Sequence, residues 1–241
     1  MMKRKKRVLR LGVCMALLLC LMLGVVGCGD DTPVEEENKE VELTEDVQYE
    51  INSFLSVFPD NRLFGYDQKK TIDFEKIRFA HSFVEKNDFS SVEYLDEDEK
   101  FYTAINLDVL NTALYHYFGE EILLRENEIL TSEDGDEEFI FRDGQVLHPS
   151  ADSDLSEWAV IVDKMVEGED GQFEVDFHVY GVDNLDSLEF GEWDDILHYN
   201  AEQAKEDKHI ELQADGKAIV KMIHEEEEDH YQLVMLTMNM G

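Results

Sequence analysis

Cysteine is scarce in this chain, and none lies beyond residue 28. The three cysteines among the 241 residues are Cys14, Cys20 and Cys28. Residues 29–241 therefore offer no thiol for a disulfide, a thiolate metal site or a nucleophile. The fold of this long segment must rest on its hydrophobic core. Fourteen Phe, nine Tyr and two Trp supply that core and exclude a chain that is disordered throughout.

Positive charge is scarce as well. Lys and Arg number 21 against 57 Asp and Glu, which gives a net charge of −36 at pH 7. Because phosphate binding needs a basic surface, no nucleic acid is expected as a partner. The acidity either keeps the protein soluble or attracts divalent cations and basic partners.

The first residues depart from this composition. Met1–Arg10 contains six basic side chains and no acidic one, and Leu11–Gly27 contains no charge. An uncharged run of 17 residues is at the short limit for a membrane-spanning helix, which needs about 20. A basic segment followed by an apolar segment that ends in small residues is typical of a secretory signal peptide.

The end of this segment is more specific. Val25-Val26-Gly27-Cys28 resembles the lipobox of bacterial lipoproteins. The resemblance implies that the sulfur of Cys28 receives a diacylglyceryl group and that the signal is cut just before it. The lipid on Cys28 would then hold the protein at the outer, extracytoplasmic face of the cell membrane, where two acyl chains suffice for stable anchoring. The alternative is an uncleaved signal anchor with an incidental cysteine.

This interpretation divides the chain into three segments. Residues 1–27 form the lipoprotein signal peptide, residues 28–43 an acidic tether with the lipidated Cys28, and residues 44–241 a single α+β domain. Without the signal, 15 basic residues remain against 57 acidic ones, a net charge of about −42. The tether is acidic and poor in aromatics, so it is expected to stay extended and to make no core contact.

Apolar spacing predicts three helices in the first half of the domain. The first is capped by Thr44 and ends at Pro59, the second follows Asp73, and the third runs from its cap Asn106 to Gly119. The residues expected to face inward are Val47, Ile51, Phe54, Leu55 and Phe58, then Phe74, Ile77, His81 and Val84, then Leu107, Leu110, Leu114 and Tyr117.

After Gly119 the hydrophobic period changes from 3.6 to 2, which predicts hairpins. Asp143-Gly144 fits a type I′ turn, Gly168–Gly171 a second turn and Asp215-Gly216 a third, while residues 194–205 are ambiguous and fit a helix. The expected strands are Phe101–Ile105, Phe139–Arg142, Gln145–His148, Trp158–Val166, Phe173–Val179, His209–Leu212, Lys217–His224 and Tyr231–Met238.

Helices first and antiparallel hairpins afterwards predict an α+β fold, with N-terminal helices packed on a C-terminal, hairpin-rich antiparallel sheet. The segments Ile51–Ser56, Phe74–Phe83 and Tyr117–Glu121 are also similar to a group of uncharacterised Gram-positive lipoproteins. That similarity covers about a third of the chain. The group implies no activity, so the similarity assigns no catalytic residue.

No motif of a known catalytic class occurs: GxGxxG, GxxxxGK[ST], HExxH and GxSxG are all absent from the sequence. We therefore assign no catalytic residue, no cofactor and no metal ligand, and whether the protein is an enzyme stays open. His81 is expected in the core and His116 at the surface.

Three acidic segments are candidate cation sites. His224–His230 could hold Zn²⁺ between two imidazoles and a carboxylate, or could be a solvated turn. Asp152–Glu157 begins like a calcium loop but has Glu157 where the sharp turn needs Gly. Thr131–Glu138 is an acidic loop without a known geometry. A solvated loop is the favoured interpretation of all three.

These observations favour a binding or interaction module that recognises an envelope protein or another envelope component. One alternative is a hydrolase that acts on envelope material through two carboxylates about 5–10 Å apart, at least one of them desolvated. The other is low-affinity binding of divalent cations. An apolar patch or a hollow on the sheet would favour the first function.

The lipid anchor gives the first testable prediction. Cys28→Ala should abolish incorporation of labelled fatty acid in cells and impair signal cleavage, because no other residue of the mature chain offers an anchor. Cys20→Ala, which leaves the lipobox intact, is the matched control and should incorporate label normally. A chain that starts after Gly29 should be soluble without detergent. Continued labelling of Cys28→Ala would contradict the lipoprotein interpretation.

Overall fold

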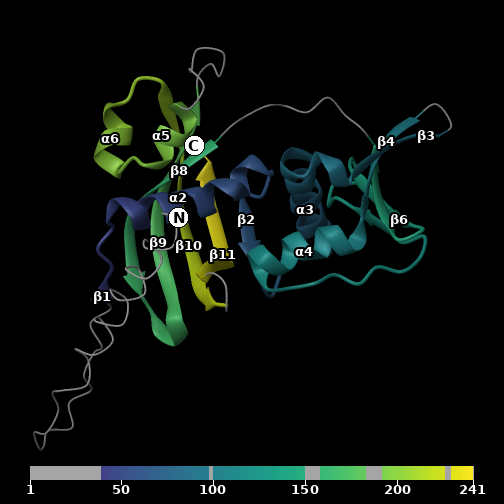
Figure 1. Cartoon of the computed structure of the whole chain (residues 1–241), viewed down its shortest axis with the longest axis horizontal. Helices are drawn as coiled ribbons and strands as arrows, with labels where there is room; N and C mark the ends of the chain where they lie inside the picture. Colours follow the sequence, from purple (N-terminus) through teal and green to yellow (C-terminus); the bar gives the residue numbers. More distant parts are fainter. Residues whose placement is uncertain (1–38, 98–99, 150–157, 183–191, 226–228, 241) are drawn as a thin grey trace, which may run out of the picture. The chain divides into compact units, whose positions relative to one another are not determined.

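The computed structural model describes residues 39–97, 100–149, 158–182, 192–225 and 229–240. They form an α+β fold with two antiparallel sheets (Figure 1), so the predicted fold class is confirmed. The described residues belong to one structural unit. Cys28 lies outside the described residues.

The larger sheet, sheet A, has six strands in the order β1-β8-β9-β10-β11-β2, all paired antiparallel. Both edge strands are only two or three residues long, a common protection against edge-to-edge association. The strands are β1 (Lys39–Glu40), β8 (Trp158–Glu167), β9 (Gln172–Val182), β10 (Ile210–His224), β11 (Asp229–Met240) and β2 (Gly65–Asp67).

The smaller sheet, sheet B, has the order β3-β4-β7-β6-β5. The predicted hairpin at Asp143-Gly144 joins β6 to β7, and φ angles of 53° and 78° at these residues fit the predicted type I′ turn. The strands are β3 (Val92–Glu97), β4 (Lys100–Asn106), β5 (Ile129–Thr131), β6 (Glu138–Arg142) and β7 (Gln145–Pro149). The predicted hairpins are thus divided between two sheets.

The helices are α2 (Glu45–Asp60), α3 (Asp73–Asn87), α4 (Leu107–Phe118), α5 (Glu192–Leu197) and α6 (Ala201–Glu206), with 3₁₀ turns η2 (Phe89–Ser91) and η3 (Glu169–Gly171). The caps are confirmed, since Thr44 and Asn106 accept backbone N–H groups and Gly119 is left-handed at φ 67°. Pro59 lies inside the last turn of α2, so the prediction that it ends the helix is wrong by one residue. No helix of the described residues is long and apolar enough to span a membrane.

A polar stripe on α2 covers the part of the β8 edge that β1 leaves unpaired. Gln48, Asn52, Ser56 and Asp60 are spaced by four residues, so they lie on one side of the helix. The Asn52 Oδ1 accepts the N–H of Val162 at 2.8 Å, the Ser56 Oγ accepts that of Val160 at 2.8 Å, and the Asp60 Oδ1 accepts that of Trp158 at 2.7 Å. The Gln48 amide donates to the carbonyl of Val162 at 2.9 Å. The helix therefore satisfies backbone groups that a neighbouring strand would otherwise pair.

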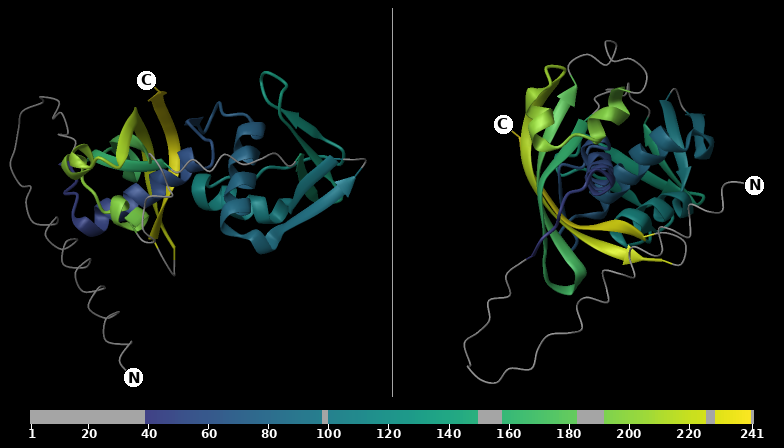
Figure 2. Two further views of the ribbon diagram at one scale, coloured as in Figure 1. Left: turned by 90° about the horizontal axis from the view of Figure 1, so that it is seen from above. Right: turned by 60° about the vertical axis from the view of Figure 1, so that its left-hand side comes forward.

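The main core joins the inner face of sheet A, helices α2, α3 and α4, and sheet B, which contributes Ile105, Phe139 and Val146. The right-hand view of Figure 2 shows α2 within the curve of sheet A. Aromatic rings join the helices: Phe79 of α3 lies 5.5 Å from Phe58 of α2 and 5.4 Å from Tyr117 of α4, between ring centroids. Burial in this cluster raises the pKa of Tyr117 to about 12.

Within the part of the chain that the structure describes, helices cover only one end of the outer face of sheet A. Helices α5 and α6 pack against one end of it, through a second small core made of Ala159, Ile161, Tyr180, Ile196, Ala204 and Ile210. The predicted helix over residues 194–205 is therefore two short helices, the second capped by Asn200. The Asn52 amide reaches around the edge of β8 and donates to the carbonyls of Leu197 and Tyr199 at 2.9 and 3.0 Å.

The predicted turn at Asp215-Gly216 is wrong. A single strand, β10, runs through both residues and pairs with β9 on one side and β11 on the other. The reason for a glycine here is a close approach, because a Cβ on Gly216 would lie 2.2 Å from the ring of Phe177 on β9. The glycine leaves room for a core side chain rather than bending the chain.

The tether prediction also needs a correction at its C-terminal end. Lys39 and Glu40 pair with β8, the Val41 N–H donates to the carbonyl of Met165 at 2.9 Å, and Val41 and Leu43 pack against the core. Sheet pairing and this apolar contact hold the segment despite its acidic composition. The folded domain therefore begins before Thr44.

The role of α2 can be tested at Asn52, which is 0% exposed. Asn52→Ala should lower the free energy of unfolding by about 3 kcal/mol, because several hydrogen bonds are lost and buried backbone groups are left unpaired. The control Asn87→Ala removes an exposed bond to the carbonyl of Phe83 and should change it by less than about 0.5 kcal/mol. Urea denaturation measures the free energy of unfolding of both variants. Equal losses in the two variants would contradict the proposed role of α2.

The close approach at Gly216 gives a second test. Gly216→Ala should destabilise the protein by about 2 kcal/mol through overpacking, and adding Phe177→Leu should recover part of that loss. Gly168→Ala is the control, since a Cβ there would meet only an ordinary contact at 3.5 Å. Urea denaturation of the double-mutant cycle should give a coupling of at least about 1 kcal/mol; simple additivity would refute the explanation.

Candidate functional site

The structure separates the two histidines of the His224–His230 segment. His224 lies opposite Asp229 in the β10–β11 ladder, whereas His230 lies opposite Ile223. Because successive residues of a strand point to opposite faces, the two imidazoles face opposite sides of sheet A. The Zn²⁺ arrangement weighed from the sequence is therefore not formed, and no group of three His, Cys, Asp or Glu in the described ranges could hold a metal ion.

The other histidines and acidic segments lie as follows. His81 is confirmed in the core at 1% exposure, and His116 is exposed, with its ring stacked on that of His230. Thr131–Glu138 closes the β5–β6 hairpin, where the Ser132 Oγ donates to Asp134 at 2.6 Å. The calcium-like segment 152–157 lies outside the described residues.

A cluster of polar side chains fills the interface between α3 and sheet B. On α3, the Nδ1 of His81 lies 3.5 Å from an oxygen of Glu85. On sheet B, the Nε2 of His148 lies 3.0 Å from an oxygen of Glu137, and the two imidazole centroids are 5.5 Å apart. The Nε2 of His81 is buried without a hydrogen-bond partner.

Arg78 joins this cluster to two carboxylates. Its guanidinium bonds Glu75 on the same helix and lies 3.8 Å from Glu137. Burial raises the pKa of Glu75, while the hydrogen bond to His148 lowers the pKa of Glu137. Burial acts to raise the pKa of Glu85, but the hydrogen bonds to His81 and Thr103 and the charges of His81 and His148 together outweigh burial and lower that pKa. Two carboxylates whose pKa values are displaced in opposite directions are typical of catalytic acid–base pairs. Here, however, Arg78 forms an ion pair with both Glu75 and Glu137.

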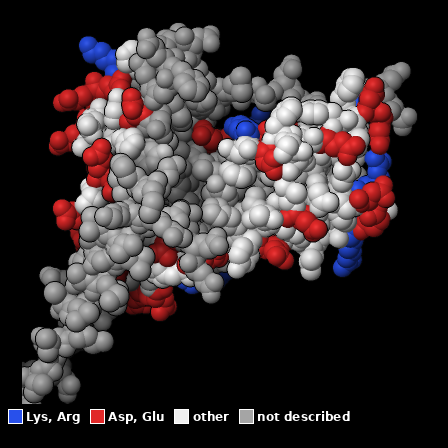
Figure 3. Space-filling model, in the orientation of Figure 1, with Lys and Arg blue, Asp and Glu red and all other residues white. Residues whose placement is uncertain are grey.

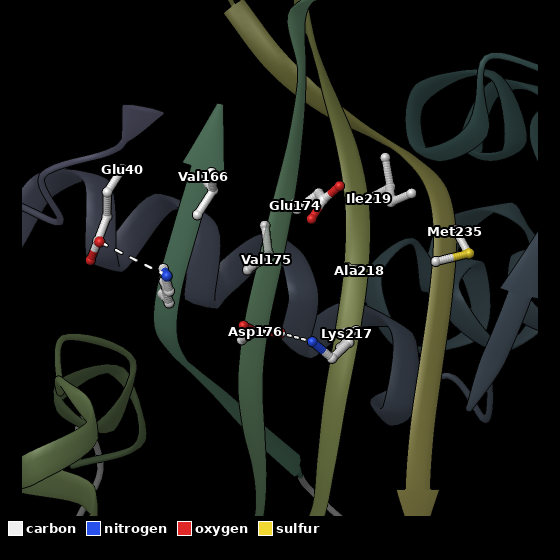
Figure 4. A pocket seen from close by; sticks show the side chains of 10 residues that line it. Glu40, Val166, Glu174, Val175, Asp176, Lys217, Ala218, Ile219 and Met235 are labelled. Carbon is white, nitrogen blue, oxygen red and sulfur yellow. Dashed lines mark ion pairs between the residues drawn. The ribbon is translucent and has the colours of Figure 1, made fainter. Parts of the chain in front are cut away.

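A hollow of about 430 Å³ lies on the outer face of sheet A (Figure 4). The view looks onto the sheet from the side opposite α2. The strands β1, β8, β9, β10 and β11 each contribute to it. Its lining residues are Glu40, Lys164, Val166, Glu174, Val175, Asp176, Lys217, Ala218, Ile219 and Met235. We call this hollow the sheet A groove.

Cross-strand pairing sets the chemistry of the sheet A groove. Val166, Glu174 and Ile219 form one row, because Val166 pairs with Glu174 and Glu174 with Ile219. The neighbouring row is charged, with Lys217 held 2.7 Å from Asp176. Lys164 lies 4.0 Å from Glu40 across the edge of the sheet. Among the described residues, no ion pair within 4 Å engages Glu174.

A second pair lies farther along the same outer face. The Nδ1 of His178 is 2.6 Å from Asp215, which is its cross-strand neighbour. Next to it, the Tyr180 hydroxyl is buried without a partner under α5 and α6, and burial raises its pKa. Because Asp215 is mostly exposed, we interpret this pair as a cross-strand contact at the border of the helical cover.

Among the charged side chains visible in Figure 3, Asp and Glu are much more widespread than Lys and Arg. This distribution agrees with the composition of the chain. Lys164 and Lys217 in the sheet A groove are therefore two of the few basic side chains on a mostly acidic surface. No family model matches this chain, and no curated protein or solved structure is significantly similar to it.

Neither site can be recognised from the sequence, because the residues of each are far apart in the chain. Glu137 and His148 were assigned to a loop and a strand, and Arg78 was not singled out. The lysines and acids of the sheet A groove alternate with apolar residues as they would in any half-exposed strand. Only the ionisable Arg78 and Glu85, close to the inward-facing His81 on the predicted helix, could have signalled the cluster.

The pair of Glu137 and His148 should leave a signature in the pH dependence of stability. Because the folded pKa of Glu137 is lowered, its contribution is present above the unfolded pKa of about 4.3 and is lost as pH falls through the folded value. Glu137→Gln should therefore cost about 1 kcal/mol at pH 6, and the difference from wild type should shrink below pH 4. Glu133→Gln, an exposed neighbour, should show no such trend in urea denaturation.

Proposed function

We propose that this protein is a lipid-anchored, extracytoplasmic binding module, with the lipid on Cys28 and with the sheet A groove as its contact surface for an envelope component. One observation carries the proposal: among the described residues, α5 and α6 cover only one end of the outer face of sheet A, and the hollow lies on the same face beyond them. A sheet face that carries apolar side chains in a hollow beside charged ones suits recognition of a ligand. The lipobox resemblance supports the anchor.

The groove also suggests what it binds. Val166, Ile219 and Met235 provide an apolar strip, while the two lysines are already neutralised by Asp176 and Glu40. Glu174 alone is left without an ion pair among the described residues of the groove. A ligand with an apolar body and one positive group would match this pattern, because it pairs the remaining charge as it covers the strip.

The anchor and the groove lie close together along the chain. Glu40 of β1 forms part of the groove wall, and eleven peptide steps separate Cys28 from Lys39. A fully extended chain of that length reaches at most about 40 Å. A lipid on Cys28 would therefore confine the groove to ligands near the membrane surface.

A hydrolase that uses Glu75 and Glu137 is the second candidate. The observation in its favour is the opposite displacement of their pKa values. Arg78 forms an ion pair with each carboxylate, which also fits a purely structural role. Binding of divalent cations is the third candidate and rests on the acidity alone. Hydrolysis of envelope material that is lost in Glu75→Gln would favour the second candidate over the first.

Site-specific photo-crosslinking tests the proposed contact surface. A photoreactive amino acid at Ile219, in the full-length protein in cells, should yield a defined adduct, whereas the same group at the exposed Lys205 of α6 should not. Glu174→Lys should reduce the adduct severalfold by reversing the unpaired charge. Adducts of equal yield at both positions, or an adduct insensitive to Glu174→Lys, would refute the groove as the contact surface.

A further inference from the structure

Three aromatic rings are exposed together at the β3–β4 hairpin. Phe89 of the preceding η2 turn, Tyr94 of β3 and Phe101 of β4 are 67%, 59% and 64% exposed. The centroids of Phe89 and Tyr94 are 5.9 Å apart. Since an aromatic side chain has roughly 200 Å² to bury, the three rings leave about 400 Å² of apolar surface in water, the size of a functional patch.

The strand register places Asp96 among these rings. Tyr94 pairs with Thr103, and Asp96 pairs with Phe101. Residues two apart on a strand share a face, so Tyr94, Asp96 and Phe101 point to the same side of the hairpin. We call Phe89, Tyr94, Asp96 and Phe101 the hairpin patch.

The patch is the uncovered continuation of a buried face. Thr103 and Ile105, on the same side of β4, are buried, and Ile105 belongs to the main core. The next position toward the hairpin tip is Phe101, which is exposed. The hairpin therefore runs past the buried part of this face, and its rings contribute little to the core of this domain.

The charges of the hairpin distinguish its two faces. Glu93 and Glu97 point to the other face, where Glu93 accepts from Gln145 at 3.0 Å and Glu97 pairs with Arg142 at 2.7 Å. Asp96 has no such partner among the described residues. The patch thus combines aromatic faces with an unpaired carboxylate, and this combination attracts a guanidinium or ammonium group.

We propose that the hairpin patch docks an arginine- and lysine-rich segment of another protein. Charge complementarity selects this partner, because the strongly acidic chain repels anionic lipids, nucleic acids and anionic polymers but steers basic partners toward it. An area of about 400 Å² is half of what one side of a standard interface buries, so a short segment is the expected occupant. In Figure 1 the hairpin lies at the opposite end of the fold from β1, and this docking surface is separate from the sheet A groove.

Hexa-arginine carrying a fluorophore is a direct probe. Its binding to the full chain in non-ionic detergent is measured by fluorescence anisotropy at physiological salt. The combined variant Phe89→Ser, Tyr94→Ser, Phe101→Ser should bind at least about 10-fold more weakly, since each cation–π contact is worth about 0.5–1 kcal/mol. Asp96→Asn should bind about 3-fold more weakly. Hexa-lysine should bind wild type more weakly than hexa-arginine, because only guanidinium stacks on rings.

Matched control variants distinguish binding at the hairpin patch from nonspecific attraction of a basic peptide to the acidic protein. The control Leu123→Ser, Ile129→Ser, Leu212→Ser removes three exposed apolar side chains elsewhere and should leave binding within 2-fold, as should Glu169→Gln. Thermal unfolding confirms that each variant is folded. The proposal is overturned if controls and patch variants lose affinity alike, if hexa-lysine binds as tightly as hexa-arginine, or if wild type binds only a neutral chitooligosaccharide.

Discussion

The fold depends on the way α2 completes the edge of β8. Four polar side chains, one per helical turn, bond the N–H and carbonyl groups that β8 presents away from β9. Without them, a buried strand edge would carry unpaired backbone groups, each costing about 1–3 kcal/mol. The same bonds fix the position and direction of α2, so they also decide which apolar side chains of α2 enter the core.

Asn52 extends this constraint to the binding surface. Its amide holds the carbonyls of Leu197 and Tyr199 at the far side of the β8 edge, which places α5 and α6 over Ile161 and Tyr180. Of the described helices, only these two pack on the outer face of sheet A, and the sheet A groove lies beyond them. The buried Asn52 side chain therefore connects α2, on the inner face of sheet A, with α5 and α6, which cover part of the outer face.

Much of the fold could be predicted, whereas little of the candidate site could. The helix caps at Thr44 and Asn106, the left-handed Gly119 and the type I′ turn at Asp143-Gly144 all follow from short-range hydrogen bonds and backbone preferences. The sheet A groove could not be foreseen, because its side chains come from five strands and each alternates with apolar neighbours in the ordinary way. The hairpin patch could not be foreseen either, because only tertiary packing decides that Thr103 is buried while Phe101, two residues away, is exposed.

The sequence by itself determined the α+β class, the helices and most hairpins, because the hydrophobic period and the capping and turn residues act over a few residues. The lipobox pattern at Cys28 is local in the same sense and remains a prediction. Tertiary structure alone decided that Gly216 makes room for Phe177, that Val41 belongs to the core, and that the strands divide into two sheets. These outcomes rest on contacts such as that of Asn52 with Val162, 110 residues apart, and no local pattern encodes which distant backbone a side chain will meet.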